Sequence, residues 1–146
     1  MALCLSNTSW LIGLSHLGVF SQERRRERQQ ICLLWKLSQE LTEGYEVRWQ
    51  WSERRGRQIL PADIPRDAPA AVRNARERSL SVHGARIFNL LPIHLRNENS
   101  GDYALFTNHL DIFLSGIPDQ PTVPGLTRAA ESNSLLHQIP AASVLV

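Results

Sequence analysis

The sequence has few of the features that assign a protein to a class directly. Its two cysteines, Cys4 and Cys32, cannot build a disulfide framework and lack the paired spacing of a zinc site. No apolar run approaches the ~18–20 residues of a membrane helix, which argues against a membrane-spanning chain. No two acidic residues are adjacent, so the chain offers no Asp-Asp pair to hold two catalytic metal ions.

Catalytic motifs are also missing. The sequence contains no G-x-S-x-G, no glycine-rich phosphate loop and no C-x-x-C. Its five histidines include no pair at the i, i+4 spacing of a helical metal site, and none has a carboxylate at a recognisable spacing. His94 and His109 could meet if their helices pack, but a structural role explains them more simply. We therefore expect no independent enzyme, no metal and no cofactor.

The N-terminal segment carries no charge. Residues 1–19 are weakly apolar and are interrupted by Asn7, Thr8, Ser9, Gly13 and His16. A secretory signal needs a basic start and a continuous apolar centre, and both are absent. We expect an intracellular protein, cytoplasmic or nuclear and not secreted, with a short helix around Trp10–Leu17.

Charge is distributed unevenly, and nearly all of the positive charge is arginine. Residues 22–100 carry fifteen basic and ten acidic residues, whereas residues 101–146 carry one basic and four acidic ones. Fifteen of the sixteen basic residues are arginines, whose planar fork binds phosphate bidentately and stacks on bases. The first two-thirds is therefore a candidate polyanion-binding surface. The alternative is a solvated charged face produced by a compositional bias toward arginine.

The strongest helical signal runs from Ser21, an N-cap candidate, to Gly44, a C-terminal stop. Its second half has an apolar stripe at helical spacing, made of Ile31, Leu34, Trp35, Ser38 and Leu41. Its first half, residues 23–28, is charged on all sides and is predicted to project from the core. Its arginines either contact phosphate or form a solvated helix end with weak i, i+3 pairs.

A strand and turn follow. Tyr45, Val47, Trp49 and Trp51 alternate with polar residues, the chain turns over residues 52–57, and a second strand over 57–60 follows before Pro61. We predict that the tryptophans form the buried face of a small sheet. The alternative is a stacking platform for single-stranded nucleic acid, formed with the neighbouring arginines.

The rest of the chain completes a mainly α fold with a small antiparallel β-hairpin (α+β) and a flexible, Pro-containing C-terminal tail. The tail contains Pro118, Pro121 and Pro124, which favour extended chain. We expect three regions: 1–20, divergent; 21–116, a helical module; and 117–146, extended and loosely ordered, with one helix turn or more over 129–138. The predicted elements are a loop over 61–69, a helix over 70–78, a strand over 79–83 able to pair near Arg57, a helix over 85–91, and a helix capped by Ser100 and ended by Gly116.

From about Leu17 onward the chain resembles the region beyond the polymerase core of reverse transcriptases from jockey-like non-long-terminal-repeat retrotransposons. The similarity is collinear, and it includes the Trp51-Ser52-Glu53-Arg54-Arg55-Gly56-Arg57 and Phe88-Asn89-Leu90-Leu91-Pro92 motifs. The matching stretches are residues 17–28, 31–44, 51–57, 78–84, 88–92, 95–97, 106–114, 117–121 and 131–136.

The resemblance implies a non-catalytic C-terminal fragment of an RNA-directed DNA polymerase. In that family polymerisation depends on palm-domain aspartates, which lie before this region, so no catalytic residue can be carried over. Residues 1–16 depart from the family pattern, which suggests a truncated copy of the element. The implied activity is weak electrostatic binding of RNA or DNA, through Arg24, Arg25, Arg26, Arg28, Arg54, Arg55 and Arg57.

A second hypothesis needs no nucleic acid. The apolar helices predicted over 31–41 and 103–114 could bind a protein partner or self-associate. This is the alternative to the nucleic-acid-binding hypothesis.

Overall fold

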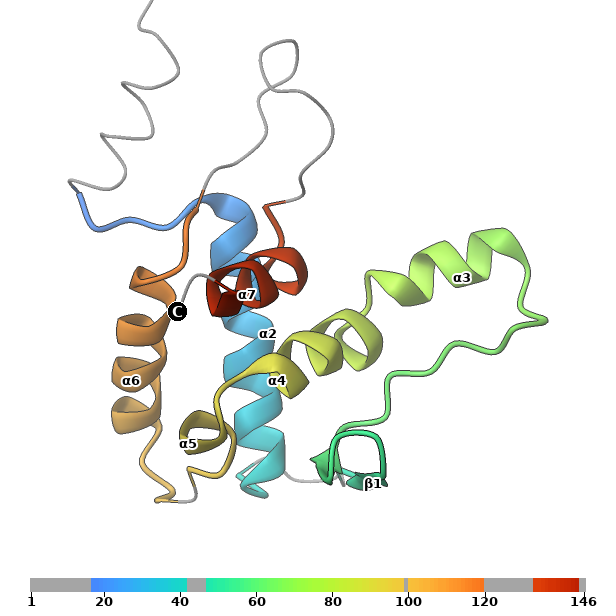
Figure 1. Cartoon of the computed structure of the whole chain (residues 1–146), viewed down its shortest axis with the longest axis horizontal. Coiled ribbons are helices and arrows are strands. Elements are labelled where there is room, and N and C mark those ends of the chain that lie inside the picture. The colour runs from blue at the N-terminus through green and yellow to red at the C-terminus, as the bar shows by residue number, and fades with distance from the viewer. Residues whose placement is uncertain (1–16, 42–46, 99, 120–132, 145–146) are drawn as a thin grey trace, which may run out of the picture.

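A computed structural model describes residues 17–41, 47–98, 100–119 and 133–144 of the chain. The described part is mainly helical with one two-stranded antiparallel sheet, which confirms the predicted fold class (Figure 1). None of its helices is long and apolar enough to cross a lipid bilayer. The elements are α2 (Gln22–Ser38), β1 (Gln50–Ser52), β2 (Arg57–Ile59), α3 (Ala70–Glu77), the π-helix η1 (Leu80–Gly84), α4 (Ala85–Leu90), α5 (Ile93–Arg96), α6 (Tyr103–Ser115) and α7 (Leu135–Val144).

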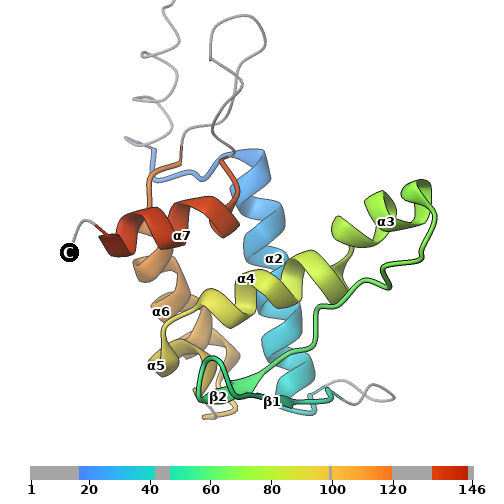
Figure 2. The ribbon, with the colours of Figure 1, turned by 45° about the vertical axis from the view of Figure 1, so that its right-hand side comes forward.

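Helix α2 is the centre of the molecule. Helix α4 crosses it, α6 lies on one side, and α7 packs on α4 (Figures 1 and 2). The β-hairpin lies at the C-terminal end of α2, and α3 projects from the body with no buried residue. The predicted helix over 10–17 falls almost wholly outside the described residues.

The start of α2 is as predicted, but its end is not. The Ser21 hydroxyl accepts a hydrogen bond from the Arg24 backbone N–H at 3.2 Å, which confirms the N-cap. The helix ends at Ser38, because Glu40 has a left-handed backbone conformation (φ 56°) that a helix cannot continue through. The prediction of a helix reaching Gly44 is therefore wrong, and Leu41 is exposed.

The apolar core forms where α2 meets α4 and α6. The indole of Trp35 is wholly buried, stacks on Phe106 with ring centroids 4.5 Å apart, and donates from Nε1 to the Glu98 carbonyl at 2.9 Å. Burying one such side chain stabilises the fold by ~1.5–3 kcal/mol. Cys32 is buried in this cluster as predicted, and burial raises the pKa of its thiol.

Residues 80–83 belong to the π-helix η1 and Ser79 is its N-cap, which corrects the strand predicted over 79–83. The amides of Val82 and His83 both point to the Ser79 carbonyl, and the segment continues through the π-turn η1 into α4. Leu80 and Val82 alternate as in a strand, but Leu80, Gly84 and Ile87 also share one helical face. Gly84 allows close approach to α2, since an added Cβ would lie 3.2 Å from a Leu34 methyl group.

Helix α6 has the predicted buried stripe and a different cap. Phe106, Leu110 and Leu114 are buried, and the helix ends at Gly116 as expected. The N-cap is Asp102, whose carboxylate accepts from the Leu105 N–H at 3.1 Å, and Ser100 lies outside the helix. An aspartate is favourable here because it also faces the positive end of the helix dipole.

The charged first half of α2 does not project from the core as predicted. Arg24 and Glu27 are both buried, and they extend the same helical face that carries Ile31 and Trp35. The outward-facing positions are Glu23, Arg25 and Arg26, which are exposed. The buried face of α2 is therefore ionic at its N-terminal end and apolar beyond it.

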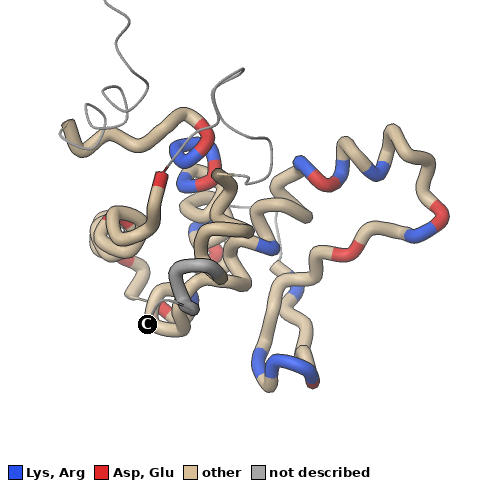
Figure 3. The backbone as a smooth tube through the Cα atoms, turned by 45° about the horizontal axis from the view of Figure 1, so that its top comes forward, with Lys and Arg blue, Asp and Glu red and all other residues tan. Residues whose placement is uncertain are grey.

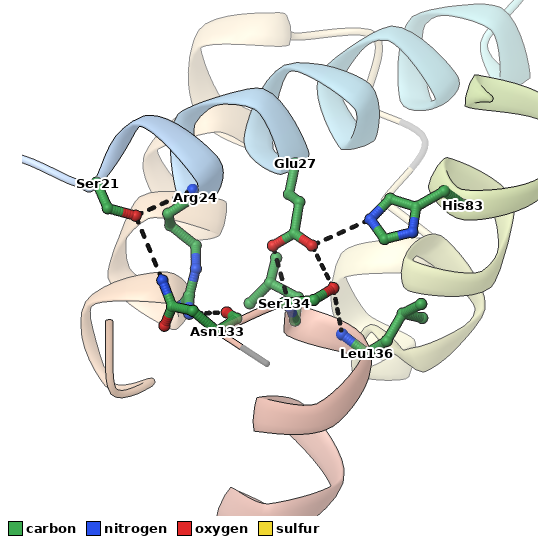
Figure 4. Close-up of polar contacts among 8 residues, drawn as sticks. Ser21, Arg24, Glu27, His83, Asn133, Ser134 and Leu136 are labelled. Atoms are coloured by element: carbon green, nitrogen blue, oxygen red, sulfur yellow. Dashed lines mark hydrogen bonds and ion pairs between the residues drawn. The ribbon is translucent and has the colours of Figure 1, made fainter. Parts of the chain in front are cut away.

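Glu27 holds the start of α7 (Figure 4). Its Oε1 accepts from the Ser134 hydroxyl at 2.5 Å and lies 3.1 Å from His83 Nε2. Its Oε2 accepts from the Leu135 backbone N–H at 3.0 Å. A carboxylate at this place satisfies an N–H that no helix can pair internally and complements the helix dipole.

Arg24 binds the backbone on both sides of residues 120–132, at Pro118 and at Asn133. Its Nη2 donates to the Pro118 carbonyl at 2.9 Å and to the Asn133 carbonyl at 3.2 Å. Figure 4 shows the second of these bonds. Asp119 accepts from the Ser21 N–H, the Ser21 hydroxyl and Asn133 at 2.6–2.7 Å. These contacts join the N-terminal turn of α2 to the C-terminal part of the chain.

The tail is thus not extended over residues 133–144, and its helix reaches further along the chain than the turn predicted over 129–138. Asn133, Ser134, Leu135 and Ile139 are buried, and α7 is a helix over Leu135–Val144. The physical reason is that Glu27 and Arg24 offer buried partners for its first turn. The stretch with Pro121 and Pro124 lies outside the described residues.

The lowered pKa of Asp119 predicts that the stability of the fold depends on pH. Burial alone would raise the pKa of Asp119, but hydrogen bonds from Asn133 and Ser21 and the charge of Arg24 outweigh it and hold the pKa below its usual value. A lowered pKa contributes stability above the unfolded-state pKa that is lost as pH falls through the folded-state value. Asp119→Asn should therefore cost ~1–2 kcal/mol at pH 7.

The difference between wild type and Asp119→Asn in urea unfolding should shrink once pH falls below ~4. The exposed Asp67→Asn variant is the control, and its unfolding free energy should match that of wild type at pH 7 and below pH ~4. A difference that stays constant from pH 7 to the acid range would contradict this account.

Candidate nucleic-acid interface

The seven predicted arginines divide into two kinds. Three of them have partners in the fold. Arg24 is buried in the ionic contact described above, Arg28 pairs with Asp111 through two bonds of 2.5 and 2.8 Å, and Arg57 donates from Nη2 to the Asn89 carbonyl at 2.6 Å. The hydrogen bond with Asp111 raises the pKa of Arg28 despite partial burial. Arg24 is inaccessible and Arg28 is paired with Asp111, so both have a structural role, whereas Arg57 keeps donors that its bond to Asn89 does not use.

The other four are exposed, but they do not form one surface. Arg25 and Arg26 lie in the first turns of α2, and Arg25 Nε donates to the Phe20 carbonyl at 2.9 Å. Arg54 and Arg55 lie in the hairpin turn, beyond the other end of α2 (Figure 3). A helix of 17 residues is ~25 Å long at 1.5 Å per residue. The structure therefore separates the predicted set into two groups.

The predicted hairpin forms, with β1 and β2 paired antiparallel and Trp51 opposite Gln58, but its first strand is shorter than predicted. The strand begins at Gln50, and residues 47–49 have no regular secondary structure. Trp51 is 65% exposed, and Trp49 is 37% exposed with its ring tilted against Phe88 at a centroid distance of 6.2 Å. The prediction of a buried aromatic face is therefore wrong for both tryptophans, and most clearly for Trp51.

A pocket of about 290 Å³ lies between the hairpin and α5. Two arginines, Arg57 and Arg96, lie beside two tryptophans in this pocket, and no acidic residue of the described ranges lines it. Its lining residues are Trp49, Trp51, Gly56, Arg57, Gln58, Ile93, Arg96 and Asn97.

Arg96 is the functional candidate that the predicted set omits. It is 5% exposed and donates from Nη1 to the Gln58 carbonyl at 3.1 Å, so it ties α5 to β2. Its Nε is buried and has no hydrogen-bond partner in the described part of the chain. Burial lowers the pKa of Arg96, and the positive charges of Arg57 and Arg55 lower it further. An isolated arginine beside an apolar Leu95 gave no signal in the sequence.

Asn89 fixes the hairpin beside α4. Its side-chain amide donates to the Leu60 carbonyl and its side-chain oxygen accepts from the Leu60 N–H, both at 2.8 Å. Its backbone carbonyl accepts from Arg57. One buried residue thus positions both the second strand and an arginine of the pocket.

Two histidines have carboxylate partners that no spacing in the sequence indicated. His83 Nε2 is 3.1 Å from Glu27 Oε1, and His109 Nδ1 is 3.1 Å from Glu98 Oε2. Both pairs join residues distant in sequence, so no local spacing reveals them. His16 lies outside the described residues. Within the described ranges, no three His, Cys, Asp or Glu side chains are grouped to hold a metal ion.

Comparisons with protein families, with curated proteins and with solved structures found no match for this chain.

Asn89→Ala should cost ~2–4 kcal/mol in unfolding free energy, because it leaves the buried N–H and carbonyl of Leu60 unpaired. Urea unfolding followed by circular dichroism measures the loss. The same substitution at the exposed Asn108 is the control and should change stability by less than ~0.5 kcal/mol. Equal effects at the two positions would show that Asn89 does not hold the hairpin.

Proposed function

We propose that this chain is a non-catalytic module similar to the region beyond the polymerase core of a jockey-like retrotransposon reverse transcriptase, and that it binds single-stranded RNA or DNA through the hairpin end of α2. The collinear sequence similarity over residues 17–136 supports the family. The observation that carries the binding function is the exposed indole of Trp51 beside the exposed Arg54 and Arg55.

The chemistry of this surface suits a single strand. Unpaired bases stack on exposed aromatic rings without regard to sequence, and arginines contact the adjacent phosphates. The other exposed group, Arg25 and Arg26, lies beside Glu23 and has no exposed aromatic ring among its neighbours in α2. The hairpin is therefore the better candidate of the two.

Binding should be weak and sensitive to salt. Contact with three or four phosphates of a single strand implies a loss of affinity of ~20- to 50-fold between 50 and 200 mM salt, since each contact releases counterions. Fluorescence anisotropy with a labelled 15-nucleotide single strand measures it. Affinity that does not change with salt would refute phosphate contact.

Arg54→Ala/Arg55→Ala should weaken binding about tenfold or more at 50 mM salt, because it removes two phosphate contacts of the hairpin. The matched control is Arg25→Ala/Arg26→Ala, which removes the same charge from the other end of α2 and should change affinity less than threefold. Equal losses in the two double variants would show that net charge, and not the hairpin, governs binding.

A second function is favoured by a different observation. The predicted interaction helices pack on each other through Trp35 and Phe106, yet α6 still exposes Leu105 and Ile112, which lie seven residues apart on one face. We propose self-association through this face as the alternative. Sedimentation would then depend on concentration at high salt and lose that dependence in Ile112→Lys, while no single strand would bind.

A further inference from the structure

The pocket between the hairpin and α5 has buried cationic residues on its inner side and apolar residues at its rim. Arg96 is nearly inaccessible and Arg57 is half-buried, whereas Trp51 and Ile93 are 65% and 61% exposed. Its volume, about 290 Å³, lies at the low end of the ~300–1,000 Å³ typical of small-molecule sites. The pocket thus has room for one phosphate and part of one ring.

The charge in this pocket is unbalanced. Arg57 and Arg96 line it, Arg55 is close enough to act on Arg96 electrostatically, and none of the lining residues that the structure describes is acidic. Buried charges in proteins are normally paired, because an uncompensated charge away from water is costly. An anion is the partner that this arrangement lacks.

The two arginines also keep unused hydrogen-bond donors. Each guanidinium has five N–H donors. Arg57 gives a bond from Nη2 to Asn89, and Arg96 gives one from Nη1 to Gln58. The Nε atoms of both are buried without a partner, and no hydrogen bond in the described part of the chain uses Nη1 of Arg57 or Nη2 of Arg96. The bonds that are made hold the two side chains in place.

We propose that this pocket binds one nucleotide unit of a single strand, with a backbone phosphate on Arg57 and Arg96 and the adjoining base on the indole of Trp51. This inference rests on the proposed function and assigns it a subsite. Arginine suits a phosphate because its planar fork matches two phosphate oxygens, and the indole accepts any base on its face. The site therefore reads the phosphate and the presence of a base, and not the sequence.

The test compares a labelled 15-nucleotide oligothymidylate with an abasic strand of the same length and charge. Wild type should bind the oligothymidylate at least fivefold more tightly than the abasic strand. Trp51→Ala, which removes an exposed ring, should bind the two strands equally. Arg96→Gln should weaken binding of both strands about tenfold, and Arg96→Lys should recover only part of the loss because lysine lacks the fork.

The matched control is Arg86→Gln. Arg86 is exposed and lines a hollow on the opposite face of the hairpin with Gln50 and Ile59. The Arg86→Gln substitution removes one positive charge, as Arg96→Gln does, and should leave the affinities for the oligothymidylate and the abasic strand within twofold of wild type. Circular dichroism confirms that each variant is folded. If Arg96→Gln does not fold, the Trp51→Ala comparison decides alone.

The outcomes separate the two proposals. If wild type binds no strand at 50 mM salt, the proposed function fails and this inference fails with it. A second outcome separates the two proposals. In it, Arg54→Ala/Arg55→Ala loses binding, Trp51→Ala still distinguishes the two strands, and folded Arg96→Gln binds like wild type. The nucleic-acid function then stands and the pocket assignment is overturned. A loss in Arg86→Gln equal to that in Arg96→Gln overturns it as well.

Discussion

The structure depends on the ionic contact that α2 makes at its buried N-terminal end. Glu27 and Arg24 occupy core positions, where each would destabilise the fold without partners. Their partners are the start of α7 and the segments around Pro118 and Asn133. The last part of the chain therefore has to dock on α2 for the N-terminal end of the helix to be stable in its buried position. The other half of α2 is buried in the apolar core around Trp35, against α4 and α6.

Local rules predicted the parts of this fold that local physics decides. The Ser21 cap, the apolar stripe of Ile31 and Trp35, and the stop at Gly116 follow from spacing and residue type, and all are present. The role of the charged tract at residues 23–28 could not be predicted in this way, because its buried members differ from its exposed ones only in helical phase. Their partners lie about a hundred residues away, so nothing nearby identified them.

The candidate site was predictable to the same extent. Arg54 and Arg55 follow from a turn rich in charge and are exposed as expected. Arg57 joins the pocket only because Asn89 holds it there, and Arg96 joins it only because α5 folds back on β2. A site formed by tertiary contacts between isolated residues leaves no motif in a single sequence.

The distance along the chain between α2 and its partners also sets an order of assembly. The contacts of Glu27 with Ser134 and Leu135 span 107 and 108 residues, and that of Arg24 with Asn133 spans 109. Such long-range contacts slow folding, since a large loop must close before they form. During synthesis α2 leaves the ribosome before α7, so Arg24 and Glu27 stay without these partners until α7 has been made. Helix α2, near the start of the described residues, is thus completed by α7, near their end.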